Sequence, residues 1–214
     1  MRLFRKSISP AFLKDISKVF SFRVHTFGGT PSGVLWKCNE GQQLRFEVLA
    51  GILDDLPPST AVTINDFGCG YGAMYDFLHD LPSMAEMTYS GYDISKKMVD
   101  TALQRNNDRR ATFSEASKID TPADFTFVSG TFNLKLDVDD GPWGTYVKST
   151  LNQLWVMSDK GLAFNMLDKN RPDQEIGLYY ANVEEYMNFC RTLSPDATFI
   201  DNYQLDEWTI FMRR

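Results

Sequence analysis

The stretch that decides the fold reads Thr63-Ile64-Asn65-Asp66-Phe67-Gly68-Cys69-Gly70-Tyr71-Gly72-Ala73-Met74. An apolar run leads into an acid, three glycines follow at alternate positions, and apolar residues then recur at helical spacing. This order predicts a strand, a tight glycine turn and a helix. Glycines let the backbone approach a ligand closely, and the start of a helix offers free N–H groups. The stretch is therefore typical of a nucleotide site.

A second strand that ends in an acid follows about 20 residues further on. It runs from Met87 to Asp93. A carboxylate at the end of the neighbouring strand can accept hydrogen bonds from ribose hydroxyls. We therefore expect Asp93 to contact the ribose of a cofactor.

Two cofactors fit this pattern. Gly68, Gly70 and Ala73 formally satisfy the dinucleotide motif G-x-G-x-x-G/A. The segment from Asp66 to Gly72 more closely resembles motif I of the class I S-adenosylmethionine (SAM) methyltransferases, which is an acid, an apolar residue and then G-x-G-x-G. In that family the acid supports the loop and the cationic methionine end of SAM. Beside a pyrophosphate the same carboxylate would be repelled.

The resemblance implies a set of cofactor contacts. Asp66 and the glycine turn would hold the methionine end of SAM, Asp93 the ribose, and Glu115 the adenine edge, where the family usually has Asp. Motif IV, at the exit of a fourth strand within 124–133, would face the methyl group. The implied cofactor-binding residues are Asp66, Gly68, Cys69, Gly70, Gly72, Asp93, Ile94, Glu115, Ala116 and Ser129.

Candidates for catalysis and acceptor binding flank this core. His25, in an expected loop over 25–38, is the candidate general base because imidazole titrates near neutral pH, although a structural histidine is the alternative. Asn133 lies where the resemblance places acceptor chemistry. The family also suggests that Gln42 and Arg45, on an expected helix over 40–54, meet the SAM carboxylate. The candidate acceptor-binding residues are Trp36, Phe132, Trp143, Arg171 and Tyr179.

Motif IV also bears on the substrate. The exit Ser129-Gly130-Thr131-Phe132-Asn133 is not the N/D-P-P-Y/F motif of amino methyltransferases that act on DNA bases or protein glutamine. Together with the tryptophan-bearing N-terminal loop and the segment Tyr179–Asn182, which we expect to begin a helix, this exit looks similar to small bacterial members of the family. The likeness implies a methyltransferase without naming its acceptor.

Alternating strand and helix patterns predict a three-layer α/β fold. The expected architecture is a Rossmann-like, seven-stranded, mostly parallel sheet preceded by an N-terminal helical extension. Two runs at 197–203 and 207–212 are too close for a crossover helix and predict a C-terminal antiparallel hairpin. A dinucleotide domain would instead continue with parallel strands. We expect a helical cap over 1–58, whose first helix lies within 1–24, and a SAM-binding domain over 59–214.

The composition limits the classes of partner and cofactor that we expect for this chain. The chain has 214 residues, a net charge of −6 and a sequence pI near 5.0, which argues against a surface that tracks nucleic-acid phosphates. Its three cysteines are widely spaced, so we expect neither a disulfide framework nor a metal site. The basic start lacks a long apolar stretch and no transmembrane run follows, so the expected location is the cytoplasm.

The resulting hypothesis is transfer of a methyl group from SAM to a small-molecule acceptor by in-line displacement, with S-adenosylhomocysteine (SAH) as product. The alternatives are an NAD-dependent oxidoreductase or an aminopropyltransferase on a related fold, or a SAM-binding protein without catalysis. The attacking atom and the oligomeric state stay open.

Overall fold

The computed structural model describes residues 10–57 and 60–214. A central sheet has the strand order β3-β2-β1-β4-β5-β8-β7, and a short β6 pairs with β5 outside this path. β8 runs antiparallel to both of its neighbours, β5 and β7, and the remaining strand pairs are parallel. The strands are β1 (Thr63–Phe67), β2 (Thr88–Asp93), β3 (Ala111–Glu115), β4 (Ala123–Val128), β5 (Ser158–Asp168), β6 (Tyr180–Ala181), β7 (Ala197–Ile200) and β8 (Glu207–Arg213).

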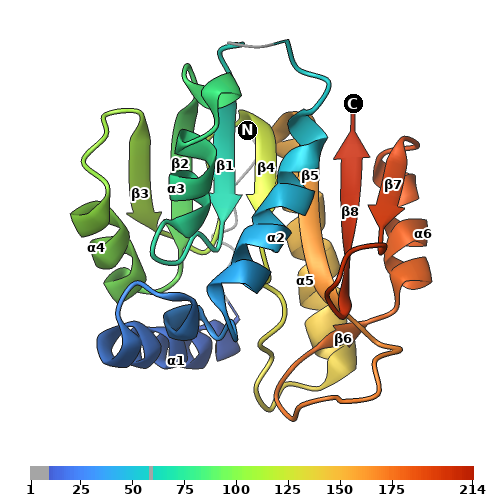
Figure 1. Ribbon diagram of the computed structural model, residues 1–214. Helices are drawn as coiled ribbons and strands as arrows, with labels where there is room; N and C mark the ends of the chain where they lie inside the picture. The colour runs from blue at the N-terminus through green and yellow to red at the C-terminus, as the bar shows by residue number, and fades with distance from the viewer. Residues whose placement is uncertain (1–9, 58–59) are drawn as a thin grey trace, which may run out of the picture.

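Helices cover both faces of the sheet and complete three layers (Figure 1). One apolar core joins the sheet to α2 and α3, and the other joins it to α5, α6 and the start of α1. The helices are α1 (Phe12–Phe27), α2 (Asn39–Ala50), α3 (Ala73–His79), α4 (Lys96–Arg105), α5 (Asp140–Val156) and α6 (Val183–Leu193). The predicted Rossmann-like architecture with its C-terminal hairpin is confirmed, with β6 as an additional strand.

The strand order reverses direction between β1 and β4. Helices that follow the strands on the two sides of such a point leave on opposite faces, so a crevice opens at the carboxyl ends of the strands. In Figure 1 this is the lower edge of the sheet, and α1 runs along it. The glycine turn and the exit of β4 therefore meet next to α1.

Three local expectations were wrong. α1 continues to Phe27, so His25 lies in its last turn and not in a loop. The glycines and proline of 137–144 predict a loop that exposes Trp143, but α5 begins at Asp140 and Trp143 is buried in its first turns. The segment Tyr179–Asn182 does not begin a helix: its backbone is extended and pairs with β5, and Asn182 caps α6 by accepting a 3.0 Å hydrogen bond from Glu185 N.

The first nine residues of the expected N-terminal helix lie outside the described part of the chain. No helix in residues 10–57 and 60–214 combines the length and the apolar character needed to cross a membrane.

Candidate active site

The glycine turn between β1 and α3 has a strained backbone that only glycine adopts easily. Gly68, Gly70 and Gly72 have φ values of 85°, 54° and 87°. The backbone N–H groups of Gly68 and Cys69 donate to the carbonyl oxygen of Tyr92, at 2.7 and 3.1 Å. The turn is thus tied to the end of β2.

Asp93 is the second anchor of this turn. Its Oδ2 accepts a 3.0 Å hydrogen bond from Gly70 N, and its Oδ1 accepts a 2.7 Å bond from Ser95 N. Ser95 in turn caps α4 by accepting from Met98 N. A carboxylate oxygen has two acceptor sites, so Asp93 can hold the loop and still accept from a ligand hydroxyl.

Asp66 lies at the end of β1 and is 2% exposed. One carboxylate oxygen accepts a hydrogen bond from the Tyr89 hydroxyl, whereas Oδ1 is buried without a partner. Burial raises the pKa of Asp66 to about 7, an effect that the Tyr89 bond opposes and nearby Asp93 reinforces. Burial likewise raises the pKa of Asp93 to about 6, against its two backbone hydrogen bonds. A cation bound here would favour ionisation of both acids.

We expect the ligand-free protein to lose stability as the pH rises from about 5 to about 7.5. An unfolded aspartate ionises at a pH of about 4, whereas Asp66 and Asp93 hold their protons up to pH values of about 7 and 6. Unfolding therefore releases protons across this window, and the free energy of unfolding falls as the pH rises, by roughly 2–4 kcal/mol from Asp66 alone. Urea unfolding across this range measures the slope.

Asp66→Asn is the matched variant, because the amide keeps an acceptor for Tyr89 and does not titrate. Its slope should be clearly shallower than that of the wild type. A stability that increases over this pH range, or an unchanged slope in the variant, would contradict the assignment.

A cavity of about 920 Å³, counted out to its open mouth, lies at the carboxyl edge of the sheet. The glycine turn lines one part of it and the exit of β4 another. The predicted residues that line it are Asp66, Gly68, Cys69, Gly70, Asp93, Ile94, Ala116, Ser129, Trp36 and Trp143.

Two predicted cofactor residues lie outside this lining. Gly72 begins α3 and packs against Asn106 and Phe113, so its freedom of φ serves the turn itself. Glu115 is exposed at the end of β3, beside Asp93 in the strand register. The backbone of Ala116 reaches the site instead, donating a 2.9 Å hydrogen bond to the carbonyl of Asp93.

Helix α1 supplies one wall of the cavity. Leu13, Ile16 and Phe20 line the cavity, and their spacing of three and four residues places them on one face of α1. Two serines dock this helix on the cofactor side: Ser17 Oγ donates to the carbonyl of Ile94 at 2.9 Å, and the hydroxyl oxygens of Ser21 and Ser95 are 2.8 Å apart. Helix α1 therefore forms part of the site.

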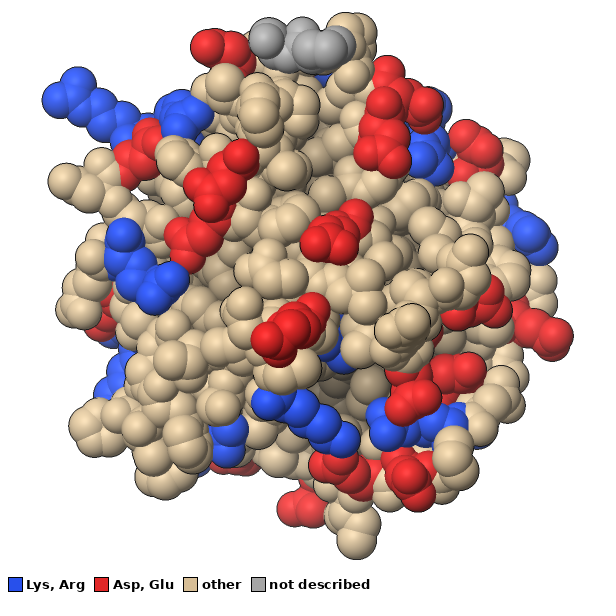
Figure 2. Space-filling model, viewed as in Figure 1, with Lys and Arg blue, Asp and Glu red and all other residues tan. Residues whose placement is uncertain are grey.

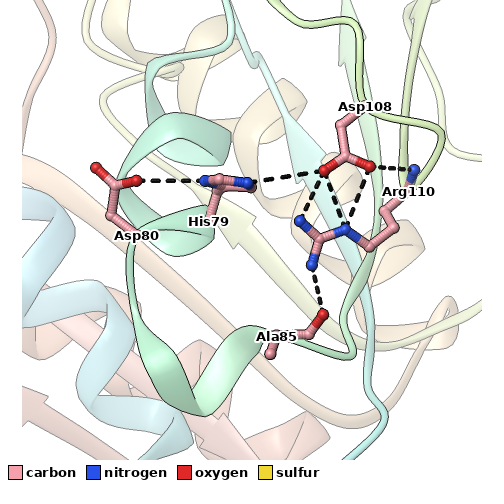
Figure 3. Close-up of polar contacts among 5 residues, drawn as sticks. All are labelled: His79, Asp80, Ala85, Asp108 and Arg110. Carbon is pink, nitrogen blue, oxygen red and sulfur yellow. Dashed lines mark hydrogen bonds and ion pairs between the residues drawn. The ribbon is translucent and has the colours of Figure 1, made fainter.

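Both histidines lie away from the cavity lining. His25 is exposed in the last turn of α1. His79 ends α3 with its ring between Asp80 and Asp108, at 3.3 and 3.7 Å (Figure 3). Asp108 also holds Arg110, and this hydrogen-bonded ion pair keeps the pKa of Asp108 well below its usual range. Neither imidazole is placed to take a proton from a molecule in the cavity.

Three of the residues that were expected to bind the acceptor make other contacts in the structure. Arg171 lies 3.4 Å from Asp206 and over the ring of Tyr180, so it does not offer its charge to the cavity. The hydroxyls of Tyr179 and Tyr186 lie 3.2 Å apart in the core. Phe132 is 1% exposed and serves packing.

A chain of polar contacts among buried side chains supports Trp36 at the cavity wall. The guanidinium of Arg45 lies 3.8 Å from the centre of the Trp36 ring, and its Nε is 2.9 Å from Glu207 Oε2. Glu207 accepts a 2.9 Å hydrogen bond from Asn165, which accepts a 2.7 Å bond from Gly130 N. Arg45 is thus engaged in this chain of contacts. Gln42, in contrast, lines the cavity and accepts a 2.7 Å hydrogen bond from the Tyr71 hydroxyl.

Solved structures share this fold. Magnesium protoporphyrin IX methyltransferase (ChlM) from Synechocystis PCC 6803, with bound SAM, has a TM-score of 0.66 at 15% identity, over 98% of this chain and 100% of that one. A SAM-dependent methyltransferase of the DUF858 family from Leishmania major has a TM-score of 0.67 at 15% identity, over 95% and 83% of the two chains. The DhpI–SAH complex has a TM-score of 0.65 at 12% identity, over 96% and 98%.

No protein-family model matches the chain. A curated relative does: "Putative methyltransferase Rv1506c" of Mycobacterium tuberculosis is 36% identical over 160 residues, which cover 71% of this chain and 93% of that protein. Identity of this extent, joined to the glycine turn, the paired acids and the strand order, shows that the chain belongs to the class I SAM-dependent methyltransferases.

Proposed function

We propose that this protein transfers a methyl group from SAM to a small-molecule acceptor. The observation that carries the proposal is a single cavity that the glycine turn lines together with the exit of β4. The glycine turn is suited to binding a nucleoside cofactor, and the exit of β4 is suited to binding a reaction partner. Acidic and basic side chains are interspersed on the face in Figure 2, where no continuous basic tract lies. This pattern supports a small acceptor over a nucleic acid.

The residues present fit SAM. Asp66 Oδ1 is buried without a partner, and a cationic ammonium group would satisfy it. Asp93 has free acceptor sites for ribose hydroxyls. SAM supplies a methyl group on a positively charged sulfur, and the two carboxylates of Asp66 and Asp93 make this part of the cavity favourable for a cation.

Asp66 and Asp93 are engaged beside the glycine turn, so no carboxylate is placed to abstract a proton on the acceptor side of the described lining. Neither histidine lies there, and burial raises the pKa of the lining residue Tyr146 to about 12, so its phenolate is scarce at neutral pH. We infer that the rate depends mainly on positioning the acceptor against the methyl group. Residues up to 58 would act as a cap on the domain formed by 59–214, since α1 supplies one wall.

Calorimetric titration with SAH tests the proposal. We expect micromolar binding, no binding of NAD, and loss of SAH binding in Asp93→Ala, because that change leaves the buried N–H groups of Gly70 and Ser95 without an acceptor. Asp159→Ala, at an exposed position of β5, is the control and should bind as the wild type does. NAD binding in place of SAH would favour an oxidoreductase, and SAH binding without turnover on any acceptor would favour a non-catalytic protein.

A further inference from the structure

The charged side chains of the cavity are confined to its cofactor side. The charged residues of the described lining are Asp66 and Asp93, which lie beside the glycine turn. Arg45 covers the lining residue Trp36, but it is paired with Glu207. An ionised acceptor would therefore give up water without gaining a counter-charge, and this loss is costly.

A second part of the cavity wall is built from the start of α1 and the start of α5. Leu13 and Ile16 of α1 and Trp143 and Tyr146 of α5 all line the cavity. Phe12 joins the two helices, because its ring centre is 5.3 Å from that of Trp143 and 5.2 Å from that of Tyr146. The rings of Trp143 and Tyr146 are themselves 5.2 Å apart. The two helices thus present one continuous surface of aliphatic and aromatic groups, which we call the apolar wall.

This apolar wall is on the β4 side of the cavity. The middle of α1 is docked at the cofactor side, where Ser17 Oγ donates to the carbonyl of Ile94, the residue that follows Asp93. The start of α1 belongs instead to the apolar core that contains Trp143 and Val128, the last residue of β4. The apolar wall is therefore next to the exit of β4, the part of the site that we assign to the reaction partner.

The polar atoms of the apolar wall are engaged within the protein. Trp143 Nε1 donates a 2.9 Å hydrogen bond to the carbonyl of Phe132. Burial raises the pKa of Tyr146 to about 12, and a hydrogen bond with Thr150, one turn further along α5, opposes this rise. Both aromatic residues therefore offer the cavity their rings, whereas their polar atoms serve the fold.

The exit of β4 adds little polarity. Thr131 Oγ1 donates a 2.8 Å hydrogen bond to the carbonyl of Phe67. Ser129 Oγ is buried. Asn133, the residue that the resemblance suggested for acceptor chemistry, is 7% exposed and is outside the described lining, and both of its side-chain polar atoms are buried. Polar recognition of an acceptor by these three side chains is therefore not supported.

From these observations we propose, resting on the methyltransferase function above, that the acceptor is an uncharged molecule whose apolar body packs against Leu13, Ile16 and Tyr146. Its affinity comes from the apolar surface that it removes from water, because the apolar wall supplies no charge. A charged substituent that faces this wall loses its hydration without replacement. Ile16 and Tyr146 thus select acceptors by the shape and size of their apolar part.

Ligand-observed NMR on the full chain loaded with SAH tests this assignment. The probes are 2-methylnaphthalene, 2-naphthoate and 2-naphthylmethylammonium, which are similar in size and differ in charge. We expect the uncharged probe to bind at least about tenfold more tightly than either ion, because an ion at the apolar wall is left without a partner. Loading with SAH fills the part of the cavity beside the two acids, so that the cation does not pair with them.

Two variants separate apolar packing from polar recognition. Ile16→Ala removes apolar surface from the wall and should weaken binding of 2-methylnaphthalene roughly tenfold. Tyr146→Phe keeps the ring and removes the hydroxyl, so its affinity for this probe should stay within about twofold of that of the wild type. Phe22→Ala is the matched control for the first variant, because Phe22 is on the same helix but is 65% exposed and outside the described lining. It should bind the probe as the wild type does.

Equal or tighter binding of either ion by the wild type would overturn the proposal, and so would unchanged affinity for 2-methylnaphthalene in Ile16→Ala. A loss of affinity in Tyr146→Phe as large as that in Ile16→Ala would assign recognition to the hydroxyl and overturn it as well. Loss of SAH binding by a folded Ile16→Ala protein would assign this wall to the cofactor instead. The order of the probes on the wild type and on Tyr146→Phe tests the proposal even where Ile16→Ala fails to fold. Failure of the methyltransferase function is distinct, since it would appear as absence of SAH binding to the wild type.

Discussion

The substitution Gly68→Ala is expected to abolish SAH binding and to lower the free energy of unfolding by roughly 2–5 kcal/mol. The first cause is the backbone, because Gly68 has a φ of 85° and an L-residue there is strained. The second is space, since a Cβ would lie 2.2 Å from Thr131 Oγ1 and 2.6 Å from Thr131 Cγ2. The turn must shift, and the part of the cavity wall that it forms shifts with it.

A double-mutant cycle separates the two causes. Thr131→Ala in the Gly68→Ala background removes the two closest atoms but not the strain in φ, so it should recover part of the lost stability. The coupling between the changes should be about 1–3 kcal/mol. Gly141→Ala is the control: no atom lies within 4 Å of its added Cβ, and α5 should be slightly stabilised. Wild-type stability and SAH affinity in Gly68→Ala would show that the turn is not as described.

Removing Arg45 is expected to be the second severe change. Arg45→Met leaves Glu207, whose side chain is 0% exposed, without its cation. Breaking a buried pair in this way costs about 3–5 kcal/mol. Burial already raises the pKa of Glu207, and Arg45 opposes that rise. Loss of Arg45 raises this pKa further, so the destabilisation should be smaller at pH values of about 5 and larger at about 8.

Urea unfolding of two further variants checks the cause. Glu207→Gln added to Arg45→Met removes the uncompensated charge and should recover most of the stability. Lys96→Met breaks an exposed pair with Asp100, whose side chains are 68% and 45% exposed, and should change stability by less than about 1 kcal/mol. Similar losses in Lys96→Met and Arg45→Met would mean that burial of the Glu207 pair has no special effect.

Local patterns in the chain were sufficient to predict the glycine turn and the two acids that the structure brings together. The glycine turn, Asp66 and Asp93 could be identified because their roles depend on backbone conformation and on the position of an acid at a strand end, and both follow from neighbouring residues. The C-terminal hairpin was predicted for the same reason, since a short connection permits only an antiparallel pair. The structure places these acids together as expected.

The acceptor half depended on contacts between distant segments. Arg45 and Glu207 are separated by 162 positions, and no pattern in the sequence predicts that they pair. Trp143 and Phe132 are aromatic residues of similar expected roles, yet Trp143 lines the cavity whereas Phe132 does not. His25 is a candidate base by residue type alone, but the length of α1 places it at an exposed position in the last turn of that helix.

The sequence by itself therefore determined the fold class, the glycine turn and the paired acids, because these are properties of backbone geometry that a few adjacent residues specify. The tertiary structure alone decided which faces line the cavity, which charges are neutralised and that one oxygen of Asp66 is buried without a partner. Those properties arise only when α1, α2, β4 and β8 meet, since burial and pairing depend on residues that are far apart along the chain.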